Sequence, residues 1–311
     1  MVKRKLKGLL LFSGGLDSLL AFKISQKLGI DLTLLIFKSY FFDEKLALKA
    51  ISLSMIKAPY RVIDISQEQF QIVKNPLYGY GKNLNPCLDC HLLMLKKAKE
   101  IKEKEGFDLV ITGEVLGERP FSQNISALKL LEEKAGLKGC LLRPLSALLL
   151  EPTIFEKEGL INRSHLLDIS GRSRKRQLEI AKKFRLKWFP TPSGGCLLTD
   201  PQFSNRLKQL LGLTEDIKDS DIELLKLGRH FVFDKLKIII GRNQEENQKL
   251  KEMREKKDLI IEMKNYPGPT ALIRSYEKRK IPEEIINKAK EMIIHYSKKT
   301  QGKKDIEFIF Y

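Results

Sequence analysis

The sequence predicts an α/β protein with a parallel sheet, followed by a smaller α+β domain. Short apolar runs typical of buried strands recur as far as residue 146, and amphipathic segments with helical spacing lie between the first of them. The first strand, helix and second strand form a βαβ unit, which requires parallel strands. After Pro201 the composition changes, and helical and strand-like pieces alternate without a glycine-rich phosphate loop. We therefore expect two domains, at 1–204 and 205–311.

The boundaries of the first elements are the clearest. The strand expected from about residue 6 to residue 12 stops at Ser-Gly-Gly, and the helix expected at 16–28 has apolar residues at helical spacing. Gly29 follows this helix and is a favourable C-cap residue. A continuous apolar run at 31–37 then predicts a buried strand.

The remaining elements continue the alternation. A helix is expected at 42–54 and a strand at 60–65, and a loop rich in turn-forming residues covers 75–83. Further along, the pattern predicts a charged helix at 91–105, strands at 108–113 and 141–146, and a helix within 168–183. Because ligands lie beyond the carboxyl ends of parallel strands, the residues that follow these strands are candidates for a binding site.

The segment Ser13-Gly14-Gly15-Leu16-Asp17-Ser18 joins the first strand to the first helix. Its glycines let backbone N–H groups approach an anion closely, and a helix N-terminus favours negative charge. The hydroxyls of Ser13 and Ser18 add donors, and the carboxylate of Asp17 can hold a Mg²⁺ ion that bridges phosphates. The order differs from the Walker A and dinucleotide-binding patterns. A glycine-rich turn that binds nothing is the alternative interpretation.

The order Ser-Gly-Gly-Leu-Asp-Ser resembles the PP-loop of the ATP pyrophosphatase superfamily. The resemblance implies an enzyme that splits ATP between the α and β phosphates and adenylates a carbonyl oxygen of its substrate. Thr112-Gly113-Glu114 and Ser122-Gln123 resemble the segment that lines the nucleotide pocket in the tRNA 4-thiouridine synthetase family. An ordinary solvated loop is the alternative for Ser122 and Gln123.

Phe37 ends the second expected strand, where it can either stack on the adenine or pack in the core. The expected ATP-binding residues are thus Ser13, Gly14, Gly15, Asp17, Ser18, Phe37 and Gly113.

Composition restricts the class of protein. The chain has 311 residues, 42% of them hydrophobic, and a formal net charge of +18, which indicates a polyanionic partner such as nucleic acid. A lysine-rich solvated surface on a heat-adapted protein is the alternative. The short apolar run near the N-terminus lacks the features of a signal peptide, and no stretch approaches the ~18 apolar residues of a membrane span. We expect a cytoplasmic protein without a membrane partner.

Three cysteines have the spacing of a reactive or metal site. Cys87-x-x-Cys90 is typical of metal and redox sites, and Cys196 lies in a turn with two prolines and two glycines that can bring a thiol to a distant motif. In a PP-loop protein this placement resembles tRNA thiolation enzymes that hold a [4Fe-4S] cluster with a CxxC pair and one later cysteine. The resemblance implies that Asp17, Cys87, Cys90 and Cys196 are catalytic, and that the three cysteines are metal ligands.

Other interpretations of the cysteines remain open. Zinc is the less favoured metal, and it normally needs a fourth protein ligand, which the adjacent His91 can supply. In a mechanism without metal, Cys87 or Cys90 and Cys196 carry sulfur as a persulfide and resolve the disulfide. Three buried, inert thiols are the simplest alternative. Cys140, at the start of an apolar strand, is expected in the core.

A basic cluster precedes the helix within 168–183. Its charges are disfavoured at a helix start, so an anion such as a tRNA phosphate is expected against them, with a solvated face as the alternative. Gly228-Arg229-His230-Phe231, Gly241-Arg242-Asn243 and Tyr296-Ser297-Lys298 resemble, in that order, the NFACT RNA-binding domain over the last third of the chain. The expected RNA-binding residues are Arg172, Arg174, Lys175, Arg176, Arg229 and Arg242.

Together these resemblances imply ATP-dependent sulfur transfer to a uridine or cytidine of tRNA. ATP, Mg²⁺ and a [4Fe-4S] cluster are the expected cofactors, and tRNA and a sulfur donor, either sulfide or a persulfide carrier, are the expected partners. The alternative is a PP-loop synthetase that acts on a small molecule and holds a structural zinc. The 4-thiouridine synthetase family carries an RNA-binding domain before its PP-loop, whereas here the first strand begins at about Leu6. We therefore expect the C-terminal domain to deliver the RNA. The modified nucleotide and the oligomeric state are left open.

Overall fold

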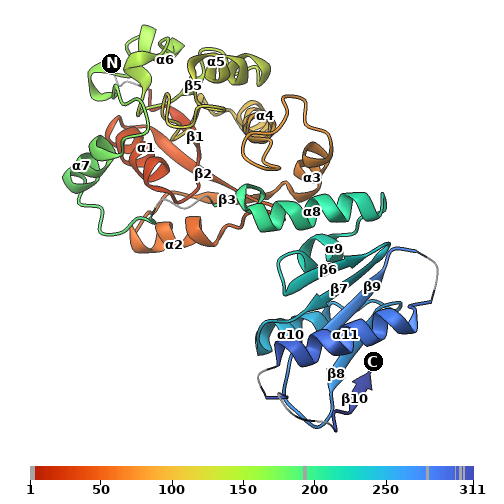
Figure 1. Cartoon of the computed structure of the whole chain (residues 1–311). Helices are drawn as coiled ribbons and strands as arrows, with labels where there is room; N and C mark the ends of the chain where they lie inside the picture. Colours follow the sequence, from red (N-terminus) through yellow and green to blue (C-terminus); the bar gives the residue numbers. More distant parts are fainter. Residues whose placement is uncertain (1–3, 192–194, 278–279, 298, 301–302, 304) are drawn as a thin grey trace. The chain divides into compact units, whose positions relative to one another are not determined.

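A five-stranded parallel sheet forms the centre of the first part of the chain in the computed structural model (Figure 1). The structure describes residues 4–191, 195–277, 280–297, 299–300, 303 and 305–311. The chain divides into two compact units, Met1–Thr199 and Asp200–Tyr311. The strand order in the first unit is β3-β2-β1-β4-β5, with the bounds β1 Lys7–Leu11, β2 Asp31–Lys38, β3 Tyr60–Asp64, β4 Leu109–Ile111 and β5 Leu141–Leu142.

This strand order locates the ligand crevice. The chain runs outward from β1 through β2 to β3, and then returns to place β4 on the other side of β1. The order therefore reverses between β1 and β4, and in open parallel sheets ligands bind beyond the carboxyl ends of the strands at such a point. The turn after β1 and the segment that follows β4 meet there.

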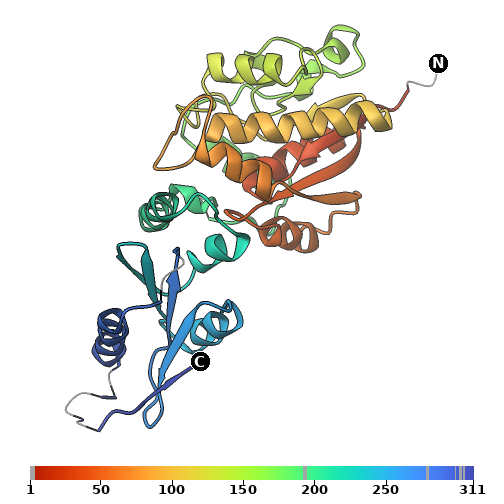
Figure 2. The same ribbon diagram turned by 90° about the vertical axis from the view of Figure 1, so that its right-hand side faces the viewer.

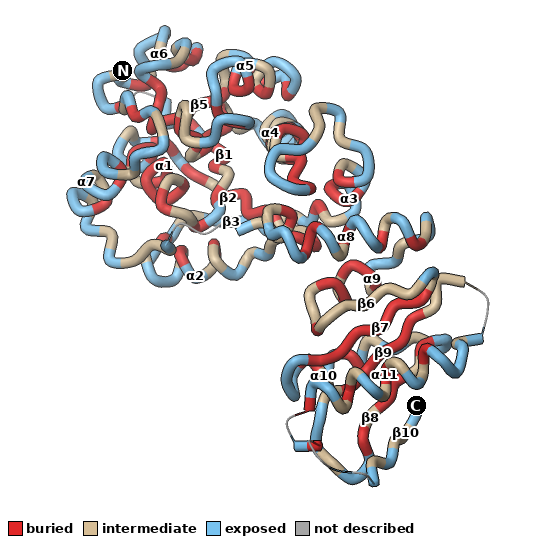
Figure 3. Tube along the Cα trace, in the orientation of Figure 1, coloured by how far each residue is buried: buried red, intermediate tan, exposed pale blue. Residues whose placement is uncertain are grey.

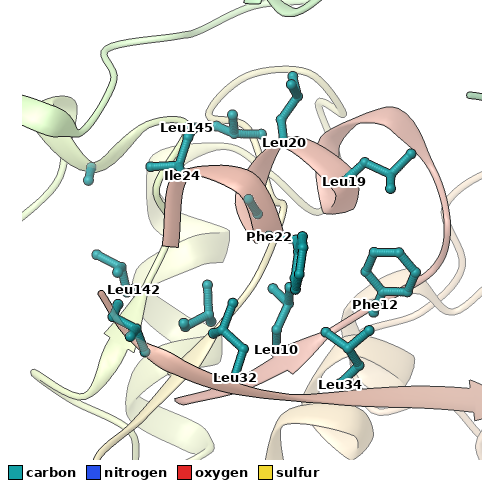
Figure 4. Close-up of a cluster of buried hydrophobic side chains, with 14 of the residues drawn as sticks. Leu10, Phe12, Leu19, Leu20, Phe22, Ile24, Leu32, Leu34, Leu142 and Leu145 are labelled. Atoms are coloured by element: carbon teal, nitrogen blue, oxygen red, sulfur yellow. The ribbon is translucent and has the colours of Figure 1, made fainter. Parts of the chain in front are cut away.

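Helices cover both faces of the sheet. Side chains alternate between the faces along each strand: Leu10 and Leu34 pack with helix α1, whereas Leu9 and Val110 pack with α4 and α5. Figure 4 shows the first of these clusters, and Figure 3 shows that the central strands are largely buried. The helices of this unit are α1 Leu16–Lys27, α2 Lys45–Leu53, α3 Ser66–Lys74, α4 Cys87–Glu105, α5 Ile125–Lys134, α6 Ile154–Lys157 and α7 Lys175–Lys183.

The predicted parallel α/β fold is confirmed, with differences at the ends of elements. Helix α4 begins at Cys87 and not at His91, because Pro86 occupies the N-cap position and Asp89 places a negative charge in the first turn. Strand β5 is shorter than expected, since Pro144 has no N–H group to continue the ladder. Helices α3, α5 and α6 were not expected from the sequence.

The second unit is an antiparallel sheet with helices, so the predicted α+β class is also confirmed. Its strand order is β10-β8-β9-β7-β6. The strands are β6 Arg229–Phe233, β7 Leu236–Ile240, β8 Leu259–Met263, β9 Ala271–Ser275 and β10 Phe308–Phe310, and the helices are α8 Pro201–Leu213, α9 Asp219–Leu224, α10 Gln244–Glu252 and α11 Glu283–Tyr296.

Both faces of this second sheet are covered. On one face Ile238 and Ile273 pack with Ile293 of α11, and on the other face Ile239 and Leu272 pack with Leu250 of α10. Figure 2 shows the dark blue helix α11 and the lighter blue α10 on opposite sides of the sheet. In the part of the chain that the structure describes, no helix combines the length and the hydropathy of a membrane span.

Candidate active site

The turn after β1 has the shape that its glycines predict. Gly14 has φ +77°, and a Cβ atom there would lie 2.6 Å from the carbonyl oxygen of Leu46, so only glycine fits. Gly15 is the N-cap residue of α1, and no side chain caps this helix. The Ser18 hydroxyl donates to the Gly15 carbonyl at 2.9 Å, and the Gly15 N–H donates to Ser13 Oγ at 3.3 Å. The first turn of α1 is thus available to an anion.

Gly113, directly after β4, lies against this turn. A Cβ atom at Gly113 would lie 2.7 Å from the backbone nitrogen of Ser18 and 2.8 Å from the carbonyl carbon of Asp17. The two backbones are therefore in direct contact at the point where the strand order reverses. This contact brings the segment after β4 to the same crevice as Ser13–Ser18.

Asp17 has the environment of a ligand-binding carboxylate. Its Oδ1 atom is buried without a hydrogen bond of normal geometry among the described residues, although the nearby Gln177 amide lowers the pKa of the carboxyl. Burial raises the pKa of Asp17 above its ordinary value, against the opposing positive charges of Arg174 and Arg119. A buried oxygen without a partner is costly, and a cation or a protonated ligand group would satisfy it.

Four residues near Asp17 were not predicted to act there. Burial and the Asp17 carboxylate raise the pKa of Glu118, while Arg119 and Arg174 oppose this shift. Arg174 occupies the N-cap position of α7, and its Nε atom is buried without a hydrogen-bond partner among the described residues. The Nε2 and Oε1 atoms of Gln177 are also buried without a hydrogen bond of normal geometry among these residues. In the sequence, Glu118 and Arg119 could have been found only from their place in the polar loop after the fourth strand. Arg174 belongs to the basic cluster, which was interpreted as an RNA-binding surface.

The charges of Cys87 and Cys196 each act on Cys90, so the three cysteines lie within electrostatic range of one another. Cys87 and Cys90 lie in the first turn of α4. Leu197 N donates to Phe41 O at 2.9 Å, and Asn83 Nδ2, in the loop before α4, donates to Thr199 O at 2.8 Å. These bonds tie the segment after Cys196 to the loop that leads into Cys87. Residues 192–194 of the proline-glycine turn lie outside the described residues.

Cys90 is buried, Cys87 and Cys196 are half-buried, and all three are free of disulfides. Burial, with the nearby Cys196 and Cys87 adding to it, raises the pKa of Cys90 to about 12, although Gln69 Nε2 donates to its Sγ atom at 3.1 Å. Burial also raises the pKa of Cys196 to about 11, and Cys87 adds to this shift. Within the described ranges, no three His, Cys, Asp or Glu side chains are arranged to hold a metal ion.

Arg119 connects the cysteines to Asp17. Burial raises the pKa of Asp17, Cys87 and Cys196, and the charge of Arg119 opposes the shift in each. The charge of Arg119 therefore acts on both sets of residues.

Glu114, which follows Gly113 in the chain, is a buried carboxylate beside this site. Its carboxylate accepts hydrogen bonds from Arg143 Nε at 2.9 Å and Thr112 Oγ1 at 3.0 Å, and lies 3.0 Å from His91 Nδ1. Although burial opposes its charge, Arg143 and His91 hold the pKa of Glu114 at about 2. One ring nitrogen of His91, the candidate zinc ligand, is thus engaged by Glu114.

Other predicted residues lie as follows. Phe37 is 8% exposed and packs in the core with Leu88, which is one of the two alternatives expected for it. Its contact with adenine stays a prediction. Ser122 and Gln123 are buried, and not solvated, with Ser122 Oγ and Gln123 Oε1 lacking partners among the described residues. Cys140 packs against the cluster around α1.

The predicted RNA-binding residues do not form one set. Arg172, Lys175 and Arg176 are exposed around the start of α7, and Arg176 pairs with Asp168 at 2.6 Å. Arg174 points away from them, toward Asp17. In the second unit, Arg229 lies over the ring of Tyr296, and Arg242 pairs with Glu246, with Nε 2.9 Å from Oε1. RNA binding by these residues stays a prediction.

Replacing Gly113 by alanine is expected to weaken ATP binding at least about tenfold. The added methyl group has to displace the first turn of α1, and such overpacking typically costs about 1–3 kcal/mol. Isothermal titration with a non-hydrolysable ATP analogue measures the effect, and Gly212→Ala, where a Cβ atom meets nothing within 4 Å, is the matched control. Equal affinity of Gly113→Ala and the original chain would contradict this assignment.

Two family models match separate parts of the chain. Residues 4–156 match the family "Thiamine biosynthesis protein (ThiI)", and residues 228–309 match "NFACT protein RNA binding domain". A "Probable tRNA sulfurtransferase" of Halothermothrix orenii is 28% identical over 144 residues, which are 46% of this chain and 36% of that protein. The chain thus spans about a third of the length of this curated relative.

The similarity to solved structures is lower. A crystal structure of a 4-thiouridine synthetase in complex with RNA and ATP has 18% identity and a TM-score of 0.39, covering 71% of this chain and 52% of that one. A "predicted subunit of tRNA methyltransferase" from Methanocaldococcus jannaschii has 17% identity and a TM-score of 0.34, covering 61% and 95%.

The sequence matches agree with the two units of the structure. One match contains the turn after β1, Gly113 and the CxxC pair, and the other contains most of the antiparallel sheet. Residues 4–156 are a domain of the ThiI family, and residues 228–309 are an NFACT RNA-binding domain.

Proposed function

We propose that the chain is an ATP-dependent sulfurtransferase that modifies a uridine or cytidine of tRNA in the cytoplasm. Residues 1–204 are the catalytic domain in this proposal, and residues 205–311 bind the RNA. The observation that carries it is that the charge of Arg119 lowers the pKa of Asp17 and also the pKa values of Cys87 and Cys196. A site that activates a base with ATP and then delivers sulfur needs these two sets of residues side by side.

ATP binds in the crevice between β1 and β4. The backbone of Gly14 and Gly15 and the hydroxyls of Ser13 and Ser18 hold its phosphates, as at other helix N-termini. The carboxylates of Asp17 and Glu118 are close enough to raise the pKa of Glu118, and two such oxygen ligands suit Mg²⁺. Arg174, with its buried Nε atom, then donates to a phosphate.

Activation forms an adenylated base. The carbonyl oxygen of the pyrimidine attacks the α phosphorus of ATP, the bond from that phosphorus to the bridging oxygen breaks, and pyrophosphate leaves with the electron pair. Negative charge grows on the transferred phosphate and the leaving group. Arg119 and Arg174 supply fixed positive charge for this step, which is the largest kind of catalytic contribution. Water must be excluded, because it hydrolyses the adenylate.

Sulfur transfer replaces AMP at the activated carbon. Sulfide attacks that carbon, the carbon–oxygen bond breaks, and AMP leaves with the oxygen. Three free cysteines are a soft donor set of the kind that iron–sulfur clusters take, with Cys87, Cys90 and Cys196 as the ligands in this proposal, although among the described residues they are not already arranged to hold a metal ion. When bound, such a cluster would supply sulfide for this step.

Burial of the thiols supports a metal over a persulfide. With the pKa of Cys90 at about 12 and that of Cys196 at about 11, both are protonated at neutral pH in the absence of a cation. A metal stabilises thiolates directly. In the persulfide route the second cysteine has to attack as a thiolate, and an external thiol has to reduce the resulting disulfide in each cycle.

The test combines composition with reaction. Protein purified without oxygen is analysed for iron, sulfide and zinc, and is then incubated with ATP, Mg²⁺, sulfide and unmodified tRNA. We expect close to four iron and four sulfide per chain, tRNA-dependent release of AMP and pyrophosphate, and a thionucleoside in the digested tRNA. Zinc in stoichiometric amount with AMP release that ignores tRNA would refute the proposal and favour a small-molecule synthetase.

A further inference from the structure

Aromatic and cationic side chains gather between the edge strand β6 and helix α11. Arg229, Phe231 and Phe233 alternate along β6 and so share one face of the strand. The guanidinium carbon of Arg229 lies 4.4 Å from the centre of the Tyr296 ring, and the Phe231 ring centre lies 6.2 Å from it. Lys288 Nζ lies 5.0 Å from the centre of the Phe233 ring. These five side chains form what we call the β6–α11 seam.

The seam joins two sequence motifs that lie far apart in the chain. Gly228-Arg229-His230-Phe231 supplies the strand side, and Tyr296 supplies the helix side. Lys298, the last residue of the second motif, lies outside the described residues. The contact between Arg229 and Tyr296 therefore places the two motifs next to each other.

The faces of the sheet are closed to RNA bases. Proteins that read single-stranded RNA on an open four-stranded sheet stack bases on its aromatic residues. Here α11 covers one face, and α9 and α10 cover the other. The rim at β6 therefore offers aromatic and cationic side chains, and the other rim, at β10, has a smaller group in which Lys290 Nζ lies 5.4 Å from the centre of the Phe310 ring.

Tyr296 and Arg229 are accessible and available. The Tyr296 side chain is 36% exposed, and the exposed His295 ring lies edge-on to it at 4.8 Å. Arg229 makes no ion pair with an acidic side chain among the described residues, whereas Arg242 is held by Glu246. A guanidinium stacked on a ring keeps its N–H edge free for a phosphate.

We propose that the β6–α11 seam binds unpaired nucleotides of RNA, with a base stacked on the Tyr296–Arg229 pair and a neighbouring phosphate held by Arg229. Unpaired bases expose a π face, whereas the faces of paired bases are covered by their neighbours. The net charge of +18 and the RNA-binding family of residues 228–309 favour RNA as the occupant. The inference deepens the proposed function, because it names the part of the RNA substrate that the second unit holds.

The test measures binding by the full chain, without ATP or a sulfur donor, to a fluorescent single-stranded oligoadenylate. Tyr296→Ala is expected to weaken binding about tenfold, which is the effect of losing one base–aromatic stack. Tyr296→Phe keeps the ring and is expected to stay within about twofold of the original chain. Arg229→Gln is expected to reduce the slope of log affinity against log salt by about one.

Matched controls separate stacking from charge. Tyr311→Ala removes a tyrosine that is 52% exposed elsewhere in the same unit, and it should leave the affinity unchanged. An abasic ribose-phosphate oligomer of equal length should bind the original chain and Tyr296→Ala equally. Equal losses on the abasic and the adenylate oligomers, tighter binding of duplex RNA, or full affinity of Tyr296→Ala would each overturn the inference.

Failure here is distinct from failure of the proposed function. If oligoadenylate binding depends on Tyr296 but the chain forms no AMP with tRNA, the inference about the seam stands and the proposed function fails. If the Tyr296→Ala variant thiolates tRNA normally and also binds oligoadenylate normally, the proposed function stands and the inference about the seam fails.

Discussion

Replacing Asp17 by asparagine is expected to lower tRNA-dependent AMP formation at least about 100-fold. The substitution preserves the size of the side chain but removes the charge that holds Mg²⁺ on the phosphates. It also leaves Arg119 and Arg174 without the carboxylate that they face. Chromatography of AMP under saturating tRNA measures the loss, and ATP titration separates binding from turnover.

The control for this variant is an acidic residue at the other end of the sheet. Asp31 starts β2 and is exposed, so it lies at the amino ends of the strands, away from the crevice. Asp31→Asn should retain full activity. Thermal unfolding of both variants excludes a folding defect, and we expect Asp17→Asn to be as stable as the original chain or more so, because it removes a buried charge. An Asp17→Asn protein that forms AMP at the original rate would contradict its assignment to the ATP site.

The sequence predicts the part of this site that is local in the chain. The turn at 13–18 requires a strand, two glycines and a helix start in immediate succession, and all three can be recognised from adjacent residues. Gly113 was identified by family resemblance, and the structure supplies the physical reason, its contact with Ser18. The parallel order of the first strands followed from the βαβ rule in the same way.

The residues that were missed are those placed by tertiary contacts. Arg119 is surrounded in sequence by ordinary loop residues, and its role depends on groups that folding brings from α1, α4 and the turn around Cys196. Arg174 was grouped with its basic neighbours, although helix α7 turns successive side chains to different sides: Arg174 toward Asp17, Lys175 and Arg176 toward solvent. Periodicity alone could not show which side faces the crevice.

Replacing Cys196 by serine is expected to separate the two halves of the reaction. Thionucleoside formation should fall at least about 100-fold, as when an enzyme loses a residue of its reacting group. Release of AMP and pyrophosphate should continue within about threefold of the original rate, because Asp17, Arg174 and the turn after β1 remain intact, and adenylated tRNA that receives no sulfur leaves the closed site and is hydrolysed in the solvent. Mass spectrometry of digested tRNA and chromatography of AMP measure the two products in one reaction.

Cys140→Ser is the matched control, since this thiol packs against the cluster around α1 and not with the other three. It should leave both products unchanged, and it should leave the iron content unchanged, whereas Cys196→Ser should lose iron. Equal loss of AMP and thionucleoside in Cys196→Ser would mean that the cysteine is needed for activation itself. Normal thiolation by Cys196→Ser would remove Cys196 from the sulfur site, and Cys87 and Cys90 would then have to act without a third thiol.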